Sequence, residues 1–150
     1  MTVLEVKNVT GGYTRKPVLH DLDFSIGKGE LVGLIGLNGA GKSTTIKHII
    51  GTMNAANGEI LLNGKTLKDD PALYRSSFSY IPETPVLYDE LTLNEHLELT
   101  AMAYNLDKDV FEARKTSLLK EFRMEKRLNW FPTHFSKGMR QKVMIMCAFL

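Results

Sequence analysis

The chain carries one stretch that decides its fold, and it reads Gly36-Leu37-Asn38-Gly39-Ala40-Gly41-Lys42-Ser43-Thr44. It follows a short apolar run, residues 31–35, which we expect to be a strand, and it precedes a segment with helical spacing, residues 45–50. A strand, a glycine-rich loop and a helix in this order are the context in which the pattern G-x-x-x-x-G-K-[ST] binds phosphate. The stretch therefore predicts a phosphate-binding loop.

The glycines of this loop allow its backbone to approach a phosphate closely. Gly36, Gly39 and Gly41 let backbone N–H groups turn toward phosphate oxygens. Asn38 and Ala40 lie between them, and we expect them to form part of the same cradle. The start of the following helix adds unpaired donors and the positive end of a helix dipole.

Three polar residues follow at the start of the helix. Lys42 supplies a point charge for the β- and γ-phosphates, and the hydroxyl of Ser43 is placed to ligate Mg²⁺. Thr44 completes the motif. The loop as a whole predicts a site for a nucleoside triphosphate with magnesium.

The composition is that of an ordinary globular domain. The chain has 150 residues, 43% hydrophobic and 24% charged, which is the size and balance of one soluble domain. The net charge of +2 is too small to indicate nucleic acid. Glu5 and Lys7 interrupt any signal-peptide core, and no segment approaches the ~20 apolar residues that span a bilayer. We expect a cytoplasmic protein that reaches a membrane by docking to another protein.

The single cysteine, Cys147, lies in the apolar run 143–150. One cysteine excludes a disulfide framework and fits a reducing compartment. Its apolar neighbours favour a buried structural role over a nucleophilic one. The chain closes inside this run with no cap or polar tail, so we expect it to be part of a longer protein.

Alternating apolar and polar residues predict most of the first half of the chain. Residues 4–9 and 18–26 predict two strands that form an antiparallel piece beside the phosphate loop. We expect a helix to about residue 50, ended by Gly51, and a strand over 59–62. A short helix is predicted over 68–74, begun by Asp70-Pro71, and a buried strand over 78–81.

A helical insertion is predicted in the second half. Thr92-x-x-Glu95 is a capping box at the start of one helix, and Asp107 opens another. We therefore divide the chain into a β-rich frame, residues 1–90 and 137–150, and a helical subdomain, residues 91–136.

Two aromatic features leave alternatives open. Tyr13 follows two glycines that expose it, so it is either a platform for adenine, worth ~1–3 kcal/mol per stacked base, or a side chain packed on the sheet edge. Trp130, Phe131 and Phe135 cluster near Pro132. For this cluster, packing of the insertion against the frame is favoured over stacking on nucleic acid.

A second candidate anion site begins another helix. Ser136 is a natural N-cap before the apolar helix from Val143, and Gly138 lies in its first turn. Such a helix start binds anions as the first loop does. The Ser-x-Gly pattern alone is common at helix starts.

Taken in order, these features resemble one known family. They match the nucleotide-binding domain of ATP-binding cassette (ABC) transporters at four places: Tyr13, residues 36–44, residues 80–83 and residues 135–142. The chain is most similar to bacterial export-type ATPases, of the Ecs type. The resemblance implies an α/β fold: a P-loop NTPase core with an antiparallel β subdomain and a helical subdomain insertion, incomplete at its C-terminus.

The resemblance implies ATP and Mg²⁺ as ligands. In the family, an aromatic at the place of Tyr13 stacks on adenine. The family's Leu-Ser-Gly-Gly-Gln motif matches residues 135–139, so Ser136 and Gly138 are expected to contact the γ-phosphate of ATP held by a second subunit. Lys137 and Met139 replace the motif's first glycine and its glutamine. Lys137 either adds charge at that phosphate or points to solvent.

Glu83 departs from the family pattern, which usually places a glutamine there, near Mg²⁺ and the attacking water. A carboxylate ligates Mg²⁺ at least as well as an amide oxygen, but it adds negative charge near the γ-phosphate. We expect Glu83 to couple the nucleotide state to the helical insertion. The expected catalytic residues are thus Lys42, Glu83, Ser136 and Gly138, and the expected metal ligands are Ser43 and Glu83.

The resemblance also implies a strand ending in Asp-Glu, and then a histidine, after residue 150. We therefore expect weak hydrolysis by these 150 residues alone and full activity in the full-length dimer. The implied partners are transmembrane permease subunits and a second ATP-binding subunit at the inner face of the membrane, with no nucleic acid. The alternative is a soluble ABC-type ATPase acting on nucleic acid or ribosomes, which usually has two cassettes. A small-molecule kinase or GTPase leaves the motif at Ser136 unexplained.

Overall fold

The computed structural model describes residues 1–14 and 16–150, which form two compact units, Met1–Phe78 and Ser79–Leu150. The first unit holds three strands and two helices, and the second holds three α-helices and two short 3₁₀ turns. In chain order the elements are β1 (Thr2–Gly11), β2 (Leu19–Gly27), α1 (Lys42–Ile49), β3 (Asn57–Leu62), α2 (Pro71–Ser76), α3 (Leu93–Ala103), α4 (Lys108–Phe122), η1 (Glu125–Arg127), η2 (Pro132–His134) and α5 (Lys137–Phe149).

The first unit is built on an antiparallel sheet with the strand order β2-β1-β3. In the central strand β1, Leu4 and Val6 alternate with polar residues and point into the core, as the period of a strand requires. Leu4 pairs with Ile26 of β2 on one side and Leu62 of β3 on the other. The antiparallel pair predicted from residues 4–9 and 18–26 is confirmed.

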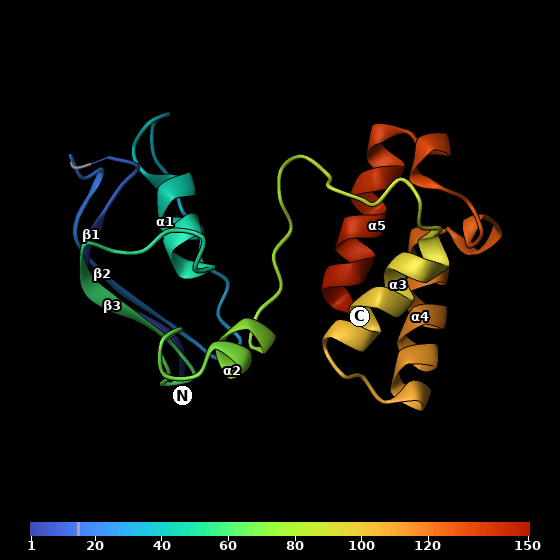
Figure 1. Cartoon of the computed structure of the whole chain (residues 1–150), viewed down its shortest axis with the longest axis horizontal. Helices are drawn as coiled ribbons and strands as arrows, with labels where there is room; N and C mark the ends of the chain where they lie inside the picture. The colour runs from blue at the N-terminus through green and yellow to red at the C-terminus, as the bar shows by residue number, and fades with distance from the viewer. Residues whose placement is uncertain (15) are drawn as a thin grey trace. The chain divides into compact units, whose positions relative to one another are not determined.

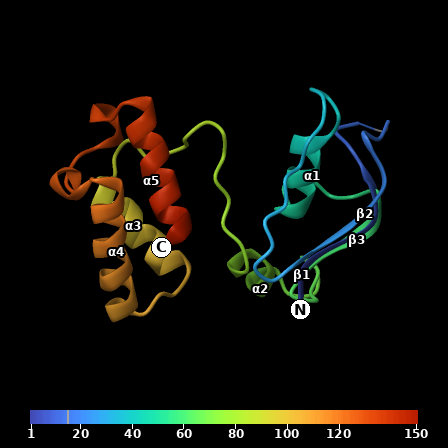
Figure 2. The same ribbon diagram turned by 180° about the vertical axis from the view of Figure 1, so that it is seen from behind.

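Helix α1 covers this sheet. It lies over one face of the strands (Figure 1), and the view from behind shows the same arrangement (Figure 2). Gly51 follows α1 with a φ of 75°, and so ends the helix as predicted. Tyr74 of α2 is buried in the same core, and its hydroxyl donates to the Ile49 carbonyl at 2.7 Å. The expected short helix begins where Asp70 accepts from the Leu73 amide.

Two predicted strands are wrong. Residues 31–35 and 78–81 have no strand pairing in the described part of the chain. Leu31 and Ile35 are fully or almost fully exposed, and Tyr80 is about half exposed at 47%. An apolar run becomes a strand only where its backbone groups pair with a neighbour, and in the described residues neither run pairs with the edge strands β2 and β3.

The second unit packs α3, α4 and α5 around one apolar core, the helical group in Figure 1. Leu93, Leu97, Val143 and Met146 are fully buried there, and residues of α4 complete the core. Helix α5 also caps its neighbour, because the Lys142 ammonium donates to a carbonyl in the last turn of α4 at 3.0 Å.

The predicted helix starts of the second unit are confirmed. Thr92 accepts from the Glu95 amide at 3.3 Å, and the Glu95 carboxylate accepts from the Thr92 amide at 2.7 Å, which completes the capping box. Asp107 caps α4 through the amides of Asp109 and Val110. In the described residues, no helix combines the length and apolar character needed to cross a membrane. The division into a frame and an insertion at 91–136 stays a prediction.

Candidate functional site

The loop between residues 36 and 44 depends on glycine for its backbone geometry. Gly39 and Gly41 have φ values of 86° and 93°, a region that side chains with a Cβ rarely adopt. A Cβ on Gly41 would also lie 2.7 Å from Cδ2 of Leu19, a buried residue of β2. Both the backbone conformation and the close approach of Leu19 therefore require a glycine at position 41. Gly41 leads directly into α1.

The N-terminus of α1 lacks the usual side-chain cap. Gly41 is the N-cap residue, no side chain caps the first turn, and that turn holds no acidic residue. The Ser43 side chain is exposed there, whereas Thr45 is buried and its hydroxyl donates to the Gly41 carbonyl at 3.0 Å. The helix start therefore presents amides and the positive end of its dipole to an external anion.

Lys42 folds back over the loop. Its ammonium donates to the carbonyls of Gly36 at 2.7 Å and Leu37 at 2.8 Å. These bonds hold a positive charge against the backbone of the loop. A phosphate bound there would replace neutral carbonyl acceptors by charged oxygens, which make stronger hydrogen bonds with an ammonium.

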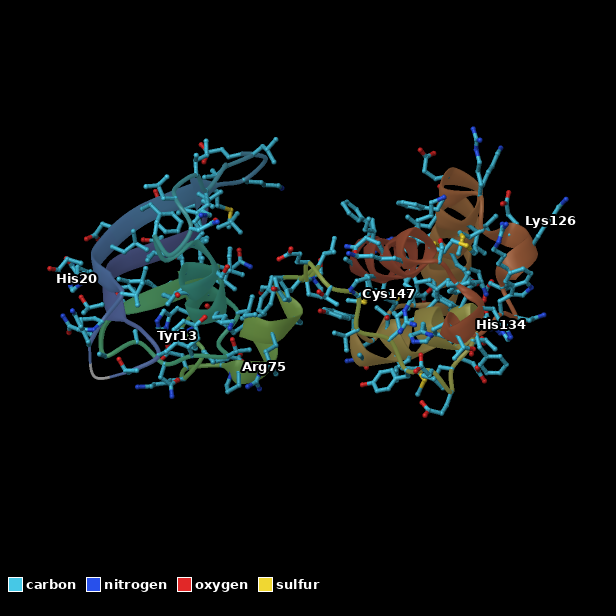
Figure 3. The ribbon with its side chains drawn as sticks, turned by 90° about the horizontal axis from the view of Figure 1, so that it is seen from above. Tyr13, His20, Arg75, Lys126, His134 and Cys147 are labelled. Carbon is cyan, nitrogen blue, oxygen red and sulfur yellow. The ribbon has the colours of Figure 1, made fainter. Side chains whose placement is uncertain are left out.

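Tyr13 lies in the connection between β1 and β2, beside α1, and is labelled in Figure 3. Its side chain is 60% exposed. The ammonium of Lys47, on α1, donates to the Tyr13 hydroxyl at 3.0 Å. The hydrogen bond from Lys47, and after it that from Thr44, lowers the pKa of the Tyr13 hydroxyl below its ordinary value. The exposed ring leaves a surface on which a base can stack.

These residues fit a magnesium–triphosphate ligand. The loop supplies amides at an uncapped helix start, an ammonium at Lys42 and an accessible hydroxyl at Ser43. Phosphates bind to such amides and cations, and a hydroxyl is an oxygen ligand of the kind that Mg²⁺ takes. Among the described residues, no group of three or more His, Cys, Asp and Glu side chains forms a separate metal site.

The second unit carries the other predicted helix start. The Ser136 hydroxyl accepts from the Met139 amide at 3.3 Å and caps α5, as expected. A Cβ on Gly138 would meet nothing within 4 Å, so the first turn of α5 faces open space. Lys137 is exposed. An anion can therefore approach the helix start at Gly138, while the Met139 amide is bonded to the Ser136 hydroxyl.

Glu83 is exposed in the loop that leads to α3. The preceding residue is held in place, because the Gln141 side chain of α5 donates to the Pro82 carbonyl at 3.5 Å. The Glu83 loop is thus attached to the same helix that Ser136 caps.

The structure groups the predicted site residues by unit. Tyr13 and residues 36–44 belong to the first, and Glu83, Ser136 and Gly138 belong to the second. Sequence reasoning missed Lys47. Its only signal in the sequence is a basic residue on the phosphate-loop helix, which does not reveal what lies opposite.

The remaining sequence predictions have mixed outcomes. Phe135 is buried and stacks on Trp130, with ring centroids 6.3 Å apart, which agrees with a packing role. Trp130 and Phe131 keep 44% and 38% of their surface exposed. Cys147 on α5 (Figure 3) is partly buried against the core of the second unit, and burial raises the pKa of its thiol.

Comparison with known proteins identifies the family. The sequence profile described as ABC transporter matches residues 19–150. The chain belongs to the ABC transporter family. The ATP-binding protein EcsA of Bacillus subtilis (strain 168), an ABC-type transporter component, is 69% identical over 150 residues, which are all of this chain and 61% of EcsA.

Solved structures agree with this assignment. The structure of an ATP binding subunit of an ABC transporter is 62% identical, with a TM-score of 0.95 over 97% of this chain and 61% of that one. CbiO1 from Clostridium perfringens, described as part of the ABC transporter complex cbiONQ, is 22% identical, with a TM-score of 0.80 over 98% of this chain and 61% of its own. The α/β fold of ABC ATPases is thereby confirmed. The chain spans about three fifths of the length of these relatives.

Proposed function

We propose that this ABC chain belongs to the ATP-binding subunit of a membrane transporter, which binds Mg-ATP and powers transport by hydrolysis in the full-length dimer. The observation that carries the proposal is the phosphate loop. Its glycine geometry, its uncapped helix and its inward-facing Lys42 ammonium together make a cationic cradle of backbone donors. The similarity to EcsA supports the transporter context.

Within the proposed site, each residue has a role of its own. Lys42 binds the β- and γ-phosphates, and the amides of residues 36–44 hold their oxygens. The hydroxyl of Ser43 ligates Mg²⁺, which neutralises charge on the phosphates when bound. The exposed ring of Tyr13 stacks on adenine. All four features lie in the first unit.

The second unit supplies the remaining proposed roles. Ser136 and Gly138 at the open first turn of α5 contact the γ-phosphate held by a second ATP-binding subunit. Glu83 serves as a further oxygen ligand for Mg²⁺ and couples the nucleotide state to the helical insertion. The fixed amides and dipole of α5 stabilise charge on the transferring phosphoryl group.

The proposed partners are transmembrane permease subunits and a second ATP-binding subunit, at the cytoplasmic face of the membrane. CbiO1 is described as part of a transporter complex, which supports assembly with other subunits here. The alternative, a soluble ABC-type ATPase acting on nucleic acid or ribosomes, predicts purification without any membrane protein. Co-purification from a native membrane extract separates the two.

Nucleotide titration tests the binding part of the proposal. We expect the chain to bind Mg-ATP and the Lys42→Met variant to lose that binding, because the cradle loses the ammonium that lies inside the loop. Lys28→Met is the matched control, because Lys28 lies in the exposed turn after β2. Equal Mg-ATP affinity in all three proteins would refute the site.

A further inference from the structure

The Tyr13 ring lies in an exposed connection, yet it is tied to the phosphate-loop helix. The Lys47 ammonium lies 3.0 Å from the Tyr13 hydroxyl oxygen and 4.9 Å from the ring centroid. Since the hydroxyl lies on the long axis of the ring, these two distances put the ammonium toward the hydroxyl end of the ring. The centre of the ring face is left uncovered.

The other end of Lys47 is fixed as well. Its backbone carbonyl accepts three hydrogen bonds, from the Thr52 amide at 3.0 Å, the Thr52 hydroxyl at 3.1 Å and the Met53 amide at 3.2 Å. The next residue, His48, is buried and lies against Gly11, where an added Cβ would be 2.6 Å from the imidazole Nε2. Lys47 therefore projects from a backbone that is anchored at the end of β1.

We propose that Lys47 is a positioning residue for the base: it holds the Tyr13 ring at a fixed place and angle relative to the phosphate loop, and so presents the ring face to adenine. This inference rests on the proposed function, because it takes Tyr13 as the platform for the base. Stacking on an immobilised ring avoids the entropy cost of ordering that side chain when the ligand binds. One helix, α1, thus sets the spacing between the base platform and the phosphate cradle.

The proposal separates Lys47 from Lys42 by what each one recognises. Lys42 lies inside the phosphate loop and bonds to its carbonyls. The Lys47 ammonium instead donates a hydrogen bond to the phenol hydroxyl of Tyr13. Loss of Lys47 should therefore weaken ligands that carry adenine and leave a bare triphosphate unaffected.

The test compares Mg-ATP with inorganic tripolyphosphate and Mg²⁺, each titrated into the full chain. We expect Lys47→Met, which keeps the aliphatic stem, to weaken Mg-ATP roughly two- to fivefold, the lower part of the cost of ordering one side chain, because tyrosine rotates about only two χ angles. Tripolyphosphate affinity should stay unchanged. Lys47→Arg should recover part of the ATP affinity because it keeps a donor. Equal weakening of both ligands would mean that Lys47 acts on the phosphates, and would overturn the proposal.

A double-mutant cycle with Tyr13→Phe sharpens the result. Phenylalanine keeps the stacking face and removes the hydroxyl that Lys47 holds, so Lys47→Met should have no further effect on ATP affinity in that background. Equal effects of Lys47→Met in both backgrounds would overturn the tether. A pH titration of tyrosinate absorbance tests the contact without nucleotide. Lys47→Met should raise the pKa of Tyr13 in that titration. The Tyr13→Phe variant identifies which part of the absorbance comes from Tyr13, because it lacks that part.

These outcomes distinguish the two proposals. A wild-type chain that binds neither ligand would refute the proposed function and this inference together. A wild-type chain that binds Mg-ATP more tightly than tripolyphosphate, with Lys47→Met unchanged toward both, would refute only the role of Lys47.

Discussion

Three glycines of the phosphate loop should respond differently to the same substitution by alanine. Gly36 has no positive φ, and an added Cβ would lie 3.3 Å from the Cβ of Ala40. Gly39 has a φ of 86° with nothing within 4 Å of an added Cβ. Gly41 combines a φ of 93° with a Cβ contact of 2.7 Å to Leu19. The series therefore separates backbone strain from steric overlap.

The expected losses in the free energy of unfolding follow from these environments. Gly36→Ala should change it by less than about 1 kcal/mol, because a contact of this kind is offset by the lower entropy of the unfolded chain. Gly39→Ala should cost about 1–2 kcal/mol, the penalty of a left-handed backbone for a residue with a Cβ. Gly41→Ala adds overlap with a buried core side chain and should cost about 2–4 kcal/mol in total.

Urea unfolding of the wild-type chain and the three variants measures these losses. Amide hydrogen exchange in β1 and β2 then assigns them to the first unit. Gly64→Ala is the matched control, because Gly64 has a φ of 76° and nothing within 4 Å of an added Cβ, yet lies outside the loop. It should cost as much stability as Gly39→Ala and leave Mg-ATP affinity unchanged, whereas Gly39→Ala should weaken binding. If Gly41→Ala proved no more destabilising than Gly36→Ala, the reasoning from φ and overlap would be refuted.

Three further predictions concern the second unit. Thr92→Ala should lower the free energy of unfolding by about 1 kcal/mol at neutral pH, because the Glu95 amide loses its cap. The Thr92 amide, then its hydroxyl, lowers the Glu95 pKa, and the variant loses only the hydroxyl, so part of the loss should disappear in urea titrations as pH falls through that pKa, while the part due to the cap remains. Cys147 should react with iodoacetamide more slowly than free cysteine, because burial raises its pKa; equal rates before and after unfolding would contradict this. Glu83→Gln should leave Mg-ATP affinity intact in a binding titration, and a collapse of affinity would exclude a plain coupling role.

The sequence predicts best what depends on neighbours along the chain. The Thr92 capping box and the Ser136 cap are complete within four residues, so their pattern determines the contact that forms. The strand at 31–35 is different, because its pairing depends on which backbone lies beside it. Its apolar run is typical of a strand, but in the described residues it does not pair with either edge strand of the first sheet, β2 or β3.

The functional residues divide in the same way. The phosphate loop is contiguous, so its role follows from residue type and spacing alone. The contact between Lys47 and Tyr13 joins residues 34 positions apart. Helical periodicity places Lys47 on a face of α1, but only the packing of α1 on the sheet determines that Tyr13 lies opposite. Tyr13, the proposed base platform, could therefore be located in the sequence, while Lys47, the residue proposed to orient it, could not.

The segment that carries Glu83 is fastened to α5 at three places along the helix. Gln141 donates to the Pro82 carbonyl at 3.5 Å, and the Arg140 guanidinium lies 3.4 Å from the Asp89 carboxylate. Farther along the helix, the Ser79 hydroxyl donates to the Ala148 carbonyl at 3.0 Å. Because these contacts flank Glu83 on both sides, the Glu83 loop cannot shift along α5 without breaking several of them. We therefore expect a displacement of Glu83 to disturb α5, the helix that begins after Ser136, whereas its coupling to the insertion at residues 91–136 stays a prediction.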